Sequence, residues 1–93
     1  MEKIMIVNDF FRLKNGNFII EGTYDSSKFK SKDDLKSHIG NTIIIVKPNG
    51  NKKRVEVKSI DVAISLTNLI NVAIELSSDF NEASIPRYSI VYV

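Results

Sequence analysis

The residues best suited to chemistry in this sequence lie around its single histidine, His38. Ser37 precedes it, and Asp33 and Asp34 lie within the same short segment. A serine–histidine–aspartate relay needs a base and oxyanion donors that converge from separate elements, which neighbours on one helical turn do not provide. Adjacent aspartates also point in different directions on a helix and make a poor acid–base pair. We therefore expect no catalytic role here, only charges favourable to a helix dipole.

The composition of the chain excludes further kinds of chemistry. None of the 93 residues is a cysteine, which excludes a disulfide framework, a thiolate metal site and a thiol nucleophile. No standard nucleotide-binding or metal-binding motif occurs, so we expect no enzyme activity, no metal and no cofactor. We expect no secretory leader, because the first residues lack a charged and then apolar layout, and no apolar run approaches the ~20 residues of a membrane span. The expectation is a cytoplasmic protein without membrane contact.

Basic residues gather on both sides of a turn at residues 48–51. Lys47 precedes the turn, and Lys52, Lys53 and Arg54 follow it. Such a hairpin end can meet nucleic-acid phosphates. The alternative is that these lysines keep a hairpin tip soluble and discourage pairing at a sheet edge. A formal net charge of only +2, without a recognised aromatic RNA-binding motif, favours this alternative.

Two aromatic residues lie in polar segments. Phe29 falls in a lysine-rich stretch and Phe80 in the loop before the last apolar run. Aromatic residues outside the core are frequent anchors at partner surfaces. They are equally common as residues that pack a loop against its own domain, and both interpretations stay open for this pair.

Strands separated by turns dominate the remaining pattern. They are predicted at residues 3–13, 18–25, 42–47, 55–66, 70–76 and 88–93. Asn15-Gly16 suits a two-residue type I′ hairpin turn, and Thr67-Asn68 suits another tight turn. One short helix is predicted at about residues 31–39, with Ser31 as its cap and Gly40 as its end.

The strand at residues 55–66 changes the parity of its apolar positions near Lys58 and Ser59. A β-bulge there keeps both halves facing one core and bends the strand. A small domain removes its sheet edges most completely by closure. The predicted fold is therefore all-β: one domain over residues 1–93, a six-stranded closed or partly open antiparallel β-barrel with one short helix in an insertion.

Several short motifs along the chain resemble the β-barrel second domain of translational GTPases of the elongation factor Tu type. The similar segments are residues 7–13, 16–22, 40–43, 55–60 and 83–88. Asn41 stands where that family has an aspartate, and Tyr88 where it has a glycine. The resemblance implies a free-standing barrel without GTP hydrolysis, because the sequence has no phosphate-binding loop. In that family the barrel contacts tRNA, the ribosome or partner proteins.

Two functions remain. The leading hypothesis is a non-catalytic binding module that contacts another protein, as an accessory or inhibitory factor, with Phe29 and Phe80 as its anchors. The alternative is an RNA-associated or ribosome-associated barrel that uses Lys47, Lys52, Lys53 and Arg54. The sequence does not indicate the oligomeric state or the partner.

Overall fold

The computed structural model describes residues 2–25, 31–64 and 69–93 of the chain, which form eight strands and one helix. In chain order the elements are β1 (Lys3–Ile6), β2 (Asp9–Arg12), β3 (Phe18–Asp25), α1 (Lys32–Ile39), β4 (Thr42–Val46), β5 (Lys52–Glu56), β6 (Ser59–Ile64), β7 (Leu69–Leu76) and β8 (Ile90–Tyr92). The turn expected at Thr67-Asn68 lies outside the described residues.

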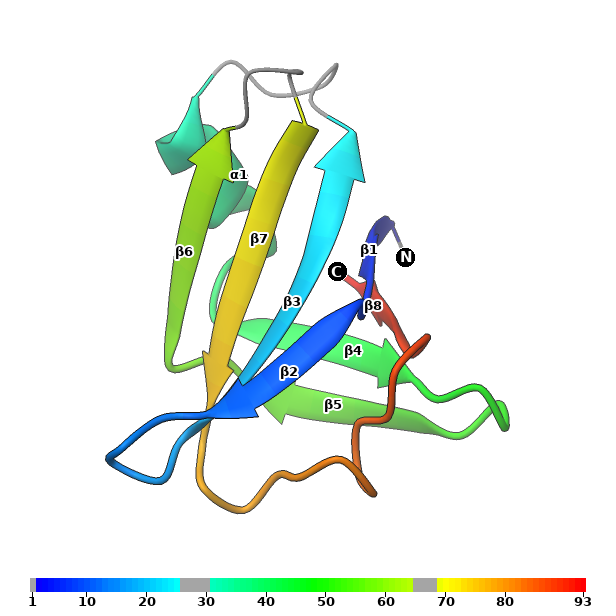
Figure 1. Cartoon of the computed structure of the whole chain (residues 1–93). Helices are drawn as coiled ribbons and strands as arrows, with labels where there is room; N and C mark the ends of the chain where they lie inside the picture. The colour runs from blue at the N-terminus through cyan, green and yellow to red at the C-terminus, as the bar shows by residue number, and fades with distance from the viewer. Residues whose placement is uncertain (1, 26–30, 65–68) are drawn as a thin grey trace.

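The strands form two antiparallel sheets of four strands each. The first sheet has the order β1-β8-β4-β5 and the second sheet the order β2-β3-β7-β6. They pack face to face with their strands crossing (Figure 1). A mostly β fold with one short helix is confirmed. The prediction of a six-stranded barrel, closed or partly open, needs correction in strand number and in closure. Two of the expected strands each pass from one sheet to the other, which gives eight strands, and no strand pair in the described ranges joins the two sheets into a closed barrel.

The first of these passages divides the strand expected at residues 3–13. The Val7 amide donates to the Ser89 carbonyl, 2.8 Å away, beside the first sheet. The amide of the next residue, Asn8, donates to the Glu21 carbonyl of β3, also at 2.8 Å. The backbone therefore changes sheets between two adjacent residues, and β1 and β2 belong to different layers.

The second passage divides the strand expected at residues 55–66. The Val57 amide donates to the Asn41 carbonyl beside β4 at 2.9 Å, and the Lys58 amide donates to the Glu75 carbonyl of β7 at 2.8 Å. The parity change expected near Lys58 and Ser59 thus marks a change of sheet, and the predicted bulge within one strand is wrong. Both halves still face one core, because the two sheets cover that core from opposite sides.

Two hairpins share one turn design, at residues 13–17 and 47–51. In each five-residue segment, the amide of the first residue donates to the carbonyl of the fifth residue, and the amide of the fourth residue donates to the carbonyl of the first residue. These hydrogen bonds measure 2.8–3.0 Å. Gly16 and Gly50 have φ of 92° and 91°, as a three-residue loop ending in a left-handed residue requires. The type I′ turn expected at Asn15-Gly16 is wrong, because Asn15 does not have positive φ.

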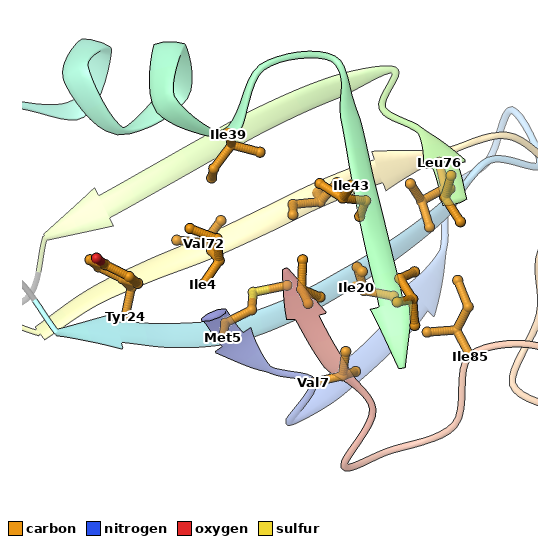
Figure 2. Packing of buried hydrophobic residues seen from close by; sticks show 14 of the residues in the cluster. Ile4, Met5, Val7, Ile20, Tyr24, Ile39, Ile43, Val72, Leu76 and Ile85 are labelled. Carbon is orange, nitrogen blue, oxygen red and sulfur yellow. The ribbon is translucent and has the colours of Figure 1, made fainter. Parts of the chain in front are cut away.

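The helix closes one end of the space between the sheets. The limits of α1 agree with the prediction. Ser31 is the N-cap, and its hydroxyl accepts a hydrogen bond from the Asp34 amide at 3.2 Å. At the other end, the Gly40 amide donates to the Lys36 carbonyl. Leu35 and Ile39 are buried. Figure 2 shows Ile39 pointing from α1 toward the core residues of β4 and β7, so α1 covers the end that the strands leave open.

Candidate functional site

The outer face of the first sheet carries two cross-strand rows of similar composition. The rows are Ile6–Ile90–Val46–Lys52 and Lys3–Tyr92–Ile44–Arg54. The intervening residues Met5, Val91 and Ile45 are buried and point into the core. Each outer row is therefore apolar at its centre; the first row is basic at the β5 edge and the second row at both edges. We call these eight residues the basic-rimmed face.

The apolar centre of the basic-rimmed face is open to solvent. Ile6 is 37% exposed, and Ile44, Val46, Ile90 and Tyr92 are half-buried. Among the described residues, α1 packs beside β6 on the other sheet, and no element forms a further layer over this face. Aliphatic and aromatic side chains that share one open face are typical of the central part of a protein interface.

The three cations of the face have no partner within the described chain. Lys3 lies on edge strand β1, and Lys52 and Arg54 lie on the opposite edge strand β5. All three are exposed, and their side chains make no hydrogen bond or ion pair to residues 2–25, 31–64 or 69–93. Glu56 is the one acidic residue in the four strands of this sheet. Positive charge therefore flanks the apolar centre on both sides.

The four basic residues predicted as a group do not all lie on one face of the sheet. Lys52 and Arg54 point outward on the basic-rimmed face, whereas Lys53 lies opposite Ile45 on the other side of the sheet. The Lys53 ammonium is 4.9 Å from the centre of the Phe80 ring. Lys47 is half-buried at the base of the hairpin turn. Only two of the four therefore belong to a common outward surface.

Phe80, one of the two predicted anchors, is half-buried and packs against the hydrophobic core. Arg12 Nη2 donates a hydrogen bond to the Phe80 carbonyl at 2.8 Å, and Arg12 Nη1 donates one to the Gly16 carbonyl at 2.6 Å. Arg12 thus ties the loop of Phe80 to the β2–β3 hairpin. The contacts of Phe80 with Lys53 and the core are those of a residue that packs its loop. Phe29, the other predicted anchor, lies outside the described residues.

The outer face of the second sheet carries acidic residues that lie far apart in the sequence. One row crosses all four strands: Asp9–Glu21–Ala73–Asp61. It lines an open concavity of about 400 Å³ together with Asn71 and Thr23. Like charges directly opposite each other are unfavourable, and Arg87 offsets part of this through an ion pair with Asp9 at 3.1 Å. The two outer faces of the domain therefore differ in charge.

The candidate catalytic residues around His38 lie apart from both outer faces. Asp33 and Asp34 occupy the first turn of α1. His38 Nε2 contacts the Glu2 carboxylate, which links the end of α1 to the residue before β1. Within the described residues, no three histidine, aspartate or glutamate side chains are placed to hold a metal ion. Every buried side-chain nitrogen or oxygen there has a hydrogen-bond partner.

The fold and the basic-rimmed face together define a small antiparallel two-sheet β domain with one open apolar face. None of the helices in the described ranges is long and apolar enough to cross a membrane. No family model, no curated protein and no solved structure matches the chain.

Proposed function

We propose that this domain is a non-catalytic binding module that holds another protein on its basic-rimmed face. The observation that carries the proposal is the combination of an exposed aliphatic centre with cations on both edges, none of which has a partner among the described residues. Stable interfaces combine a dry apolar core with a polar rim. The two rows place both features on one rigid sheet.

The face also indicates the chemistry of the partner. Burial of Ile44, Val46 and Ile90 requires apolar side chains opposite them. Lys3, Lys52 and Arg54 favour a partner with aspartate or glutamate around that apolar patch, because complementary charges guide association and set orientation. The expected partner is a protein with an apolar patch between acidic residues.

An RNA-associated function is the second candidate, and Tyr92 is the observation that favours it. This ring lies between Lys3 and Ile44 in one row of the face, and a ring beside a cation on a sheet can stack a nucleotide base. Against it, the rest of the centre is aliphatic, and the row Asp9–Glu21–Asp61 on the other sheet repels phosphates. We therefore favour a protein partner.

Selection of a displayed library of random peptides on the purified domain tests this proposal. We expect the selected peptides to combine large apolar residues with aspartate or glutamate. Ile44→Asp places a charge at the centre of the face and should weaken their binding at least tenfold, equivalent to about 1.4 kcal/mol. Ala63→Asp, at an exposed position of the second sheet, adds the same charge and should leave binding unchanged.

Charge reversal at the rim provides the second arm of the test. Lys52→Glu with Arg54→Glu should slow peptide association, whereas the matched control Lys14→Glu with Lys58→Glu should not. A labelled single-stranded RNA is measured in parallel at increasing salt. Recovery of no peptide, or equal binding by Ile44→Asp, contradicts the protein-binding proposal. Salt-sensitive RNA binding that the rim reversal abolishes would then establish the second candidate.

A further inference from the structure

Tyr88 has a backbone conformation that tyrosine rarely adopts. Its φ is 71°, and it is the one non-glycine residue with positive φ in the described part of the chain. The Ser89 amide donates to the Pro86 carbonyl at 3.2 Å, which makes Tyr88 the third residue of a four-residue turn. The hydrogen bond and the positive φ are those of a type II turn, in which this position favours glycine or asparagine.

Neighbouring residues hold this turn in place without help from the tyrosine ring. The Tyr88 amide donates to the Val7 carbonyl at 2.9 Å, and the Val7 amide donates to the Ser89 carbonyl at 2.8 Å. Ser89 is fully buried, and its hydroxyl donates to the Pro86 carbonyl at 2.6 Å. These bonds fix the backbone on both sides of Tyr88, so the strain at this residue persists.

The Tyr88 side chain has no visible structural role in the fold. It is 73% exposed and makes no hydrogen bond or ring contact with residues 2–25, 31–64 or 69–93. A bulky residue at positive φ costs folding free energy, and an exposed ring does not recover that free energy by packing. Strained exposed residues of this kind concentrate at functional sites.

Tyr88 also lies at the edge of the basic-rimmed face. Ile90 follows it by two residues, which places their Cα atoms within about 7 Å. Ile90 is the cross-strand neighbour of Ile6, and the Tyr88 amide bonds to Val7, the residue after Ile6. A partner that covers Ile6 and Ile90 therefore comes within reach of an exposed aromatic ring on a rigid turn.

We propose that Tyr88 is an anchor residue of this interface, retained for binding at the expense of stability. The inference rests on the proposed function and adds a requirement on the partner: an apolar cleft that takes a phenol ring, with a carboxylate or carbonyl oxygen to accept its hydroxyl. Tyrosine suits such a role because it offers a large rigid apolar surface with a polar tip. Anchors of this type account for most of the binding energy of an interface.

Four variants separate the effect of Tyr88 on folding stability from its role in binding. Tyr88→Asn removes the ring and tolerates positive φ, so its folding equilibrium constant should rise about fivefold in urea titrations. Tyr88→Ala removes the ring but keeps the strain and should gain no stability. Both should bind the selected peptides at least tenfold more weakly, and Tyr88→Phe should retain most of the affinity. Phe11→Ala removes an exposed ring from the second sheet and should bind as the wild type does.

Each outcome decides one claim. A less stable Tyr88→Asn variant would show that the ring supports the fold and would overturn the inference. Peptides that lose affinity with Ile44→Asp but bind Tyr88→Asn normally would overturn the role of Tyr88 and leave the proposed function intact. A failure to select any peptide on the wild type would overturn the proposed function and this inference with it.

Discussion

Gly22 in β3 lies so close to Ile6 in β1 that a methyl group on Gly22 would come within 2.5 Å of the Ile6 carbonyl oxygen. The same methyl would lie 2.8 Å from the sulfur of Met5. Gly22 belongs to the second sheet, whereas Ile6 and Met5 belong to the first. Glycine is needed here for close approach between the sheets, directly behind one end of the basic-rimmed face.

Gly22→Ala should therefore destabilise the domain strongly. The new methyl meets backbone as well as a side chain, so relief requires a shift of β1 against β3. We expect the free energy of unfolding to fall by about 3 kcal/mol in urea titrations. Gly50→Ala is the matched control: its site has φ of 91° and nothing within 4 Å of an added methyl, and it should cost about 1 kcal/mol from the left-handed backbone conformation alone. Equal losses in the two variants would argue against the close approach.

The Ser31 cap sets the start of α1 and should contribute to global stability. Ser31→Ala leaves the Asp34 amide without its side-chain acceptor, and we expect a loss of about 1 kcal/mol. Ser37→Ala, at an exposed position within the same helix, should change the free energy of unfolding by no more than about 0.5 kcal/mol. Thermal and urea unfolding both measure this difference. If Ser31→Ala leaves the free energy of unfolding unchanged, α1 contributes little to the cooperative unfolding of the domain.

Lys53 and Phe80 should be energetically coupled, because the Lys53 ammonium lies over the Phe80 ring. A double-mutant cycle with Lys53→Ala and Phe80→Leu should give a coupling energy of about 0.5–1 kcal/mol, as for other exposed cation–π pairs. The same cycle with Lys52→Ala should give none, since Lys52 points to the other side of the sheet. Coupling of Lys52 with Phe80 as large as that of Lys53 would contradict the assigned side-chain directions.

The sequence by itself determined the features that depend on neighbours along the chain. Ser31, Leu35, Ile39 and Gly40 lie within one short segment, so its limits and its buried side could be predicted from capping and spacing. The positions of the apolar runs were also correct, because alternation and turn residues are local signals. Even the parity change near Lys58 was visible, although its cause was not.

Only the tertiary structure decided which sheet each run joins and which residues meet across it. Alternation is the same for a bent strand and for a chain that changes sheets, so the passages at Val7 and Val57 could not be distinguished from bulges. The basic-rimmed face depends on the register of four strands, and a sequence does not state that register. The positive φ of Tyr88 depends on hydrogen bonds at Val7, at the other end of the chain. These features arise from contacts between distant segments, which form only when both sheets close on one core.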